Sequence, residues 1–179
     1  MKKIVLLISI CAVALLLQGC LKYGLEQPEN SADKDMTSVD YSYRFLYDDV
    51  IMEGTSREVE DKNRVCDVVF NKNVEIIDDG VNKVFKTTLT YNLNSIIKSG
   101  PSGKVTKQDL FNMFESKIAQ DGLSHLWVSV SISDGAVVEP LDNSPVLGKP
   151  GDYSSDRKYR VIAADGSSQD YIIQTIKGF

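Results

Sequence analysis

The chain has 179 residues, of which 42% are hydrophobic and 25% are charged, and its formal net charge at pH 7 is −5. This length suits one hydrophobic core and is short for two domains of ordinary size. An acidic chain is a poor ligand for nucleic acids and anionic lipid surfaces, so the charge excludes these classes of partner.

The N-terminal segment has the parts of a secretion signal. Lys2 and Lys3 supply positive charge, and an apolar run follows from Ile4 to Leu17. This run is shorter than the roughly 20 residues that span a bilayer. The segment Leu17-Gln-Gly-Cys20 then resembles a bacterial lipobox, in which the cysteine becomes the lipid-modified N-terminus. A plain signal peptide and an uncleaved anchor are the alternatives.

The lipobox predicts a signal peptide over residues 1–19 and a lipid attachment site at Cys20. The rest of the chain is then tethered in the cell envelope, because two or three acyl chains give stable membrane anchoring. Leu21, rather than an aspartate, follows the cysteine, which favours the outer membrane and permits exposure at the cell surface. Loss of Lys2 and Lys3 with the signal changes the net charge from −5 to −7.

Residues 20–38 are expected to form a flexible tether, because they are polar and show no apolar period. Cys11 leaves with the signal and Cys20 carries lipid, so Cys66 has no partner for an internal disulfide. Alternation places Cys66 on the face of a strand that carries Val68, which predicts a buried thiol. An intermolecular disulfide or a reactive thiol is the alternative.

Period-2 alternation of apolar residues dominates the rest of the chain. Strands are expected at Val39–Tyr47, Val65–Phe70, Val74–Ile77, Val84–Leu93, Leu126–Ile132, Ala136–Val138, Tyr159–Ala163 and Tyr171–Ile176. Pro140 is expected to stop the sixth strand, and residues 143–156 read as a long loop. Residues 39–179 therefore predict one all-β domain, an Ig-like β-sandwich.

One segment has the helical period instead. Apolar residues recur at helical spacing from Thr106 to Ala119, and Thr106 with Asp109 has the pattern of a capping box. Gly122 is placed to end the helix. The sequence therefore predicts one short helix that covers a sheet edge or the core.

The C-terminal segment Tyr159-Arg-Val-Ile-Ala-Ala-Asp-Gly166, followed by Tyr171-Ile-Ile, resembles a signature of Ig-like β-sandwich modules in surface lipoproteins of Bacteroidetes. The segments Gly135–Pro140 and Ser144–Tyr153 resemble the same family. Many of these modules have no known function, and they are often encoded beside starch-utilisation-type glycan uptake systems. The resemblance therefore implies a non-catalytic accessory in glycan capture or uptake, with polysaccharide or outer-membrane uptake proteins as partners.

A structural or adhesive module of a surface assembly is the alternative, because exposed sheet edges would permit it equally. An enzyme has no support in the sequence, which lacks a nucleophile elbow, a phosphate loop and a zinc-binding pattern. We expect no cofactor and no metal. Calcium binding is the alternative, with oxygen ligands from the acidic turn at Asp78-Asp79-Gly80 and from Asp152, although the pattern of a calcium-binding loop is absent. His125 is expected at the surface.

Trp127 is the most suggestive side chain for a ligand site. Its strand buries Leu126 and Val128, so Trp127 lies on the opposite face with Ser129. An exposed indole beside hydroxyl groups could stack on a sugar ring, with Tyr153 of the long loop beside it. Cover by the helix or by the loop of residues 143–156 is the alternative, because large aromatic side chains are usually mostly buried.

Overall fold

The computed structural model describes residues 30–78 and 80–179. The predicted signal peptide, Cys20 and the tether up to residue 29 lie outside the described residues. Ser31–Phe179 form one compact unit. Within the described part of the chain, no helix is long and apolar enough to cross a membrane.

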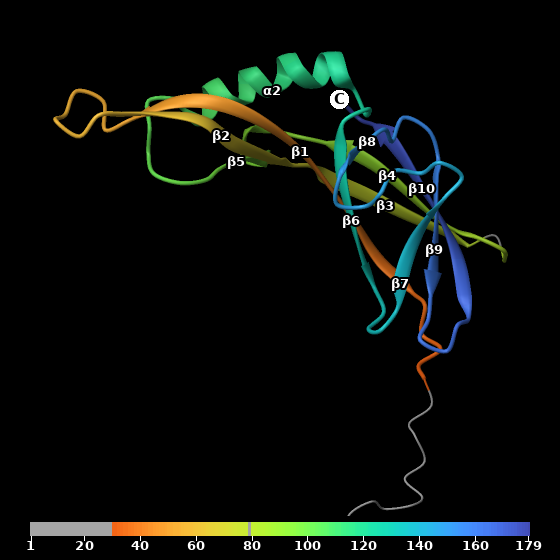
Figure 1. Cartoon of the computed structure of the whole chain (residues 1–179). Helices are drawn as coiled ribbons and strands as arrows, with labels where there is room; N and C mark the ends of the chain where they lie inside the picture. Colours follow the sequence, from red (N-terminus) through yellow and green to blue (C-terminus); the bar gives the residue numbers. More distant parts are fainter. Residues whose placement is uncertain (1–29, 79) are drawn as a thin grey trace, which may run out of the picture. The chain divides into compact units, whose positions relative to one another are not determined.

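Two five-stranded sheets make up this unit (Figure 1). Sheet A has the order β5-β2-β1-β6-β8, with β5 at Ile96–Lys98, β2 at Val59–Val69, β1 at Met36–Ile51, β6 at Leu126–Ile132 and β8 at Pro150–Gly151. Sheet B has the order β3-β4-β10-β9-β7, with β3 at Asn71–Asp78, β4 at Lys83–Thr90, β10 at Ser168–Lys177, β9 at Arg157–Ile162 and β7 at Val137–Leu141. The predicted all-β sandwich with one helix is confirmed.

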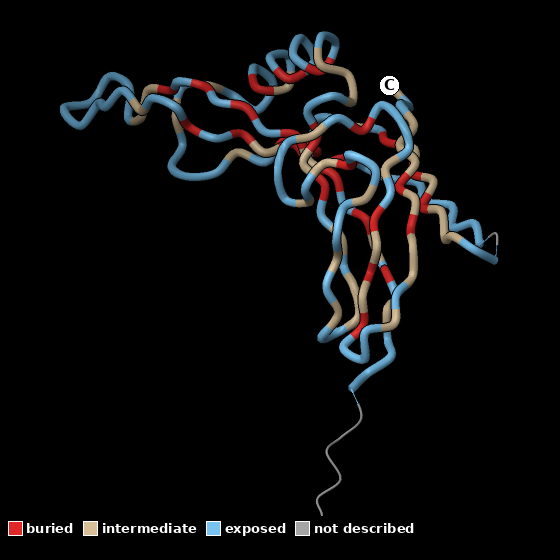
Figure 2. Tube along the Cα trace, turned by 45° about the vertical axis from the view of Figure 1, so that its right-hand side comes forward, coloured by how far each residue is buried: buried red, intermediate tan, exposed pale blue. Residues whose placement is uncertain are grey.

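The long strand β1 organises the core because its side chains alternate between two faces. Tyr41, Tyr43 and Phe45 are buried on the inner face, whereas Arg44 and Leu46, which alternate with them, are exposed on the other face. Figure 2 shows the same alternation of buried and exposed residues along the strands. Sheet B contributes buried aromatic residues to the same core, among them Phe85, Tyr159 and Tyr171. The two sheets therefore share one hydrophobic core.

The helix α2 (Lys107–Asp121) lies along the β1–β2–β5 part of sheet A (Figure 1). Its inner side is apolar, and the ring of Phe114 lies 5.6 Å from Tyr43 and 4.8 Å from Tyr91 between centroids. The predicted capping box of Thr106 and Asp109 is present, and Gly122 ends the helix. The helix therefore covers the inner face of sheet A, on the side opposite Arg44 and Leu46.

The compact unit begins earlier than the predicted boundary at Val39. The Lys34 ammonium donates to Ser167 Oγ at 3.0 Å, and the Asp35 amide donates to Ser133 Oγ at 2.9 Å. Tyr171 Oη donates to the carbonyl oxygen of Lys34 at 2.9 Å. The last residues of the predicted tether are therefore fastened to the sandwich.

Two strand boundaries also differ from the sequence prediction. The expectation that Pro140 stops its strand is wrong, because β7 continues through Pro140, which lies opposite Tyr159 of β9. β7 is the outermost strand of sheet B, and an edge strand tolerates a residue without an N–H group. β4 ends at Thr90 rather than Leu93, because Leu93–Ser95 form a short 3-10 helix capped by Asn92.

Candidate functional site

A groove lies on the outer face of sheet A, opposite the helix. Antiparallel pairing places Ser42 of β1 between Val69 of β2 and Trp127 of β6. Further along β1, Arg44 lies opposite Asp67 and Leu46 lies opposite Val65. The groove has a volume of about 360 Å³ and is lined by Arg44, Phe45, Leu46, Val65, His125, Trp127 and Pro150. We call this set the outer groove.

An ion pair and an aromatic contact fix the centre of the outer groove. The guanidinium of Arg44 lies over the indole of Trp127, with 4.6 Å from Cζ to the ring centroid. The same guanidinium donates through Nε to the Asp67 carboxylate. These side chains come from three adjacent strands, so the register of the sheet brings them together. Such a cation–π contact contributes about 0.5–1 kcal/mol at an exposed site.

The structure keeps two of the predicted ligand-binding residues on one face and separates the third from them. Trp127 is half-buried and lies in the outer groove, and Ser129 is exposed on the same face of β6. Tyr153 is fully buried, and its hydroxyl oxygen lies 3.0 Å from that of Tyr159. The assignment of Tyr153 to a ligand surface is therefore wrong, because its ring belongs to the core between the sheets.

Trp127 was expected either to be exposed or to be covered by the helix or the loop of residues 143–156, and the structure shows partial cover by the loop alone. The helix α2 packs on the opposite face of sheet A, so it does not cover the indole. The loop supplies Pro150, which lies opposite Trp127 in the β6–β8 pair and lines the groove. His125 is exposed as predicted, and it lies in the groove, which the sequence did not reveal. The indole therefore lies at the wall of a shallow groove rather than in the core.

Aliphatic side chains extend the outer groove along the same face. Each of four residues on β1, β2 and β5 exposes 44–57% of its surface: Leu46, Val65, Val69 and Ile97. Apolar residues that are exposed next to one another mark interaction surfaces more often than isolated ones do. The outer face of sheet A therefore combines an aromatic and charged centre with an aliphatic border.

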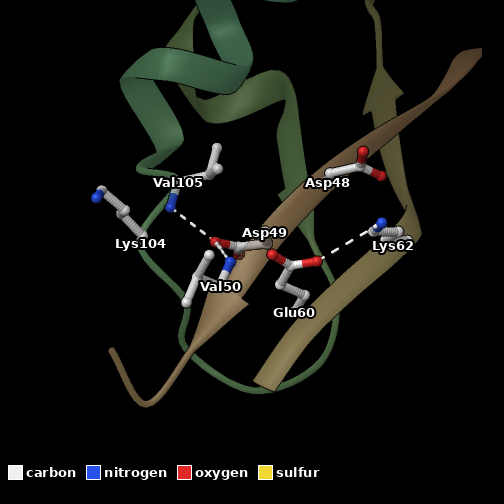
Figure 3. Close-up of a pocket in the computed structure, with 7 residues that line it drawn as sticks. All are labelled: Asp48, Asp49, Val50, Glu60, Lys62, Lys104 and Val105. Carbon is white, nitrogen blue, oxygen red and sulfur yellow. Dashed lines mark hydrogen bonds and ion pairs between the residues drawn. The ribbon is translucent and has the colours of Figure 1, made fainter. Parts of the chain in front are cut away.

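A second pocket lies at the far end of β1 (Figure 3). It has a volume of about 420 Å³ and is lined by Asp48, Asp49, Val50, Glu60, Lys62, Lys104 and Val105. The Asp49 carboxylate at its base is fully buried and lies 2.7 Å from Arg64 Nη1 and 3.2 Å from Lys98 Nζ. The amide of Val105 also donates to this carboxylate, at 2.8 Å.

These contacts favour the ionised form of the Asp49 carboxyl group. Burial raises the pKa of the carboxyl group, but hydrogen bonds from the Val105 amide, Lys98 and the Val50 amide outweigh burial, so the pKa is lowered. Nearby, Glu60 lies 3.6 Å from Lys62, and Asp48 accepts a hydrogen bond from the Asn63 amide at 2.9 Å. Each carboxylate of this pocket is thus held by a neighbour.

The cluster around Asp49 fastens a loop to the sheet. Arg64 donates through Nη2 to the carbonyl oxygens of Ser99 and Pro101, at 2.7 and 2.9 Å. A Cβ atom at Gly103 would lie 2.1 Å from Asp49 Oδ2, so the loop can approach this closely only with glycine. The cluster therefore clamps residues 99–105 onto β1 and β2.

The acidic residues of the calcium alternative are Asp78, Asp79 and Asp152. No group of three or more histidine, cysteine, aspartate or glutamate side chains within them is arranged to hold a metal ion. Of the acidic residues weighed for calcium, Asp79 lies outside the described residues. Asp152 pairs with Arg157 at 3.1 Å and accepts a hydrogen bond from the Ser154 amide.

Comparison with known proteins agrees with the fold. No curated protein matches the chain. A crystal structure of a "putative secreted protein" from Bacteroides fragilis is similar with a TM-score of 0.55 and 24% sequence identity, over 82% of this chain and 97% of that chain. At this identity the likeness shows the fold alone.

A family model described as DUF5018-related matches residues 36–174, from the first residue of β1 into β10. This match supports the predicted resemblance to a family of uncharacterised proteins. The matched region contains both sheets and the helix, so the chain belongs to the DUF5018-related family.

Proposed function

We propose that the chain is a lipid-anchored, non-catalytic binding protein of the cell envelope that acts as an accessory in glycan capture or uptake. The observation that carries the proposal is the outer groove, which presents Trp127 on a sheet face that the helix leaves uncovered. The flat apolar face of a partly exposed indole can stack on a sugar ring, and Arg44 and His125 supply polar groups beside it. Cys20 would hold this surface at the membrane.

The lining of the groove supports binding rather than hydrolysis. Glycosidases use a pair of carboxylates that flank the scissile bond. The seven described residues that line the outer groove include no carboxylate, and the nearby Asp67 is paired with Arg44. Among the lining residues, Arg44 can donate hydrogen bonds to sugar hydroxyls, and His125 can donate or accept them. Ser129 lies outside the lining, exposed on the same face of β6. A sugar ring would stack on the indole surface that Arg44 leaves open.

The location of the protein has separate support. The N-terminal segment has the pattern of a lipoprotein signal that ends at Cys20. The structural neighbour from Bacteroides fragilis is described as a "putative secreted protein" and shares the fold. Both observations favour a position outside the cytoplasm, with the outer membrane favoured by Leu21.

Replacing Trp127 tests the ligand site. Trp127→Ala should abolish glycan retention in affinity electrophoresis through gels that contain bacterial or plant polysaccharides. The indole is half-buried, so the substitution should lower the free energy of unfolding by only about 1–2 kcal/mol. Trp127→Phe keeps an aromatic face and should retain part of the binding. Retention that is unchanged in Trp127→Ala would contradict the proposal, as would a wild-type chain that no polysaccharide retards.

A structural or adhesive role is the second candidate, and the aliphatic border of the groove favours it. Val69 is 50% exposed and Ile97 is 45% exposed on the outer face of sheet A. Val69→Lys would place a charge in a protein–protein contact on this face while leaving the Trp127 indole in place. Loss of assembly with normal glycan retention in this variant would favour the adhesive role over glycan capture.

A further inference from the structure

β3 is the outermost strand of sheet B, and its eight residues are all exposed. Within residues 30–78 and 80–179, it pairs with β4 alone. The ladder is regular from Asn71 to Asp78, so one side of β3 carries a row of backbone N–H and C=O groups that no strand of the described unit meets. Such an edge is a template for a further strand.

The other edges of the two sheets are shortened or interrupted. β5 has three residues, and β8 has two residues including Pro150. β7 contains Pro140, which removes one donor from the edge. These are common ways to prevent strands from adding to a sheet. β3 is long and free of proline, so it differs from the other three edges.

The inner face of β3 also carries apolar side chains that the sandwich leaves open. Val74 lies opposite Thr87 and Ile76 lies opposite Phe85, so these side chains share the face that points toward sheet A. Thr87 and Phe85 are almost fully buried, whereas Val74 is 36% and Ile76 is 59% exposed. Sheet A therefore buries the inner face of β4 but leaves the inner face of β3 exposed.

We propose that β3 pairs antiparallel with β3 of a second copy of this chain, across a two-fold axis at Val74. Two sandwiches would then share one continuous sheet, in the isologous arrangement that most homodimers use. Backbone hydrogen bonds would form along the edge, and the two Val74 side chains would meet on the inner face. This interface lies on sheet B and is separate from the outer groove of sheet A.

The charges of β3 select this register. With the axis at Val74, Lys72 lies opposite Ile76 of the second copy, and Asn73 lies opposite its Glu75. An axis at Glu75 would place two like charges opposite each other, which is unfavourable. Axes at Asn73 or Ile76 leave a shorter paired run. The register at Val74 is the longest one that opposes no like charges.

Cysteine cross-linking tests both the pairing and its register. The experiment uses the full chain with Val74→Cys, treated with a mild oxidant in cells and after extraction in detergent. Directly opposite residues of neighbouring strands have Cβ atoms about 4.5–5.5 Å apart, close to disulfide range. We expect a disulfide-linked dimer, and light scattering of the wild-type chain should give twice the monomer mass.

Ile76→Cys is the matched control, because it is on the same face and more exposed than Val74. In the proposed register, the two Ile76 positions are about 13 Å apart along the strand, which is too far for a disulfide. The wild-type chain controls for Cys66, which is buried. Val74→Lys would bring two ammonium groups together at the axis and should shift the mass to that of a monomer, while Val74→Thr should not.

Several results would overturn the inference. A monomeric mass for the wild-type chain would do so, as would equal cross-linking of Val74→Cys and Ile76→Cys, which indicates random collision. Cross-linking of Val74→Cys to a different protein would also overturn it, because the occupant of the edge would then be another partner.

Discussion

At the scale of single residues, Cys66 shows how burial controls reactivity. Its side chain is fully buried on the inner face of β2, as its alternation with Val68 predicts. Burial, together with the charge of Asp67, raises the pKa of the Cys66 thiol to about 11. The group is therefore a protonated thiol at pH 8, and a thiol is a poor nucleophile.

We expect iodoacetamide to modify Cys66 at pH 8 only after the domain is unfolded with urea. Peptide mass spectrometry distinguishes Cys66 from the other two cysteines of the chain. Rapid modification of Cys66 in the native protein would show that the thiol is accessible, and it would reopen the alternative of a reactive cysteine.

Asp49 is the residue whose replacement should destabilise the domain most through charge. In Asp49→Asn, Arg64 and Lys98 lose their buried counter-charge, and removing one partner of such a pair costs about 3–5 kcal/mol. Urea unfolding at pH 7 should show this loss. Asp33→Asn, at an exposed position, should change the free energy of unfolding by less than about 0.5 kcal/mol.

The pH dependence of stability follows from the lowered pKa of Asp49. The stabilisation is complete above the unfolded pKa, about 3.9, and is lost as the pH falls through the lower pKa of the folded state. The free energy of unfolding of the wild-type chain should therefore fall below about pH 4, and Asp49→Asn should show a shallower fall. Parallel curves for the two proteins would mean that Asp49 is not the group that titrates.

The alternation of β6 predicted the face on which Trp127 lies, because a strand has a fixed period of two. The loop that carries Tyr153 has no such period, so its burial could not be predicted. The contact between Arg44 and Trp127 depends on the pairing of β1 with β6. A single sequence does not give the register of strands that are distant in the chain. The sequence therefore predicted the position of Trp127 on its strand but not the side chains of the neighbouring strands that contact it.

At the scale of elements, the helix α2 was predictable because its signals are local. Thr106 Oγ1 accepts a hydrogen bond from the Asp109 amide at 3.1 Å, and the Asp109 carboxylate accepts one from the Thr106 amide at 2.9 Å. Thr106→Ala removes the side-chain cap and should lower the free energy of unfolding by about 1 kcal/mol.

Chemical denaturation measures this loss, and Lys107→Ala in the first turn is the control. Lys107 is exposed and makes no part of the cap, so its replacement should change stability by less than about 0.5 kcal/mol. Equal effects of the two substitutions would contradict the assignment of the capping box.

The strands were predictable as elements but not as a sheet order. Alternation located most of them, and Asp165 and Gly166, where the backbone has a positive φ, form the turn between β9 and β10. The parallel pairing of β4 with β10 joins segments from the middle and the end of the chain, so no turn signal reveals it. The three residues of β5 are too few to show a period, and they form a strand because β2 pairs with them.

At the scale of the whole molecule, the predicted lipoprotein signal determines where in the cell the outer groove would act. Cys20→Ser removes the thiol that would carry lipid, so we expect the variant to appear in the soluble fraction or to accumulate as an unprocessed precursor. Membrane fractionation and N-terminal sequencing provide the readout. A variant that still fractionates with membranes and has a mature N-terminus would contradict the lipid anchor while leaving the outer groove unaffected.

Trp127 is the only tryptophan in the chain, so its fluorescence reports directly on the outer groove. The central claim is that this groove binds glycan, and a titration of the wild-type chain with soluble polysaccharides tests it most directly. We predict a saturable change in tryptophan emission, with reduced quenching by acrylamide, for at least one polysaccharide. The claim would be contradicted if emission and quenching stayed unchanged with every polysaccharide. It would also be contradicted if a polysaccharide bound the chain without changing either signal, because the binding site would then lie elsewhere.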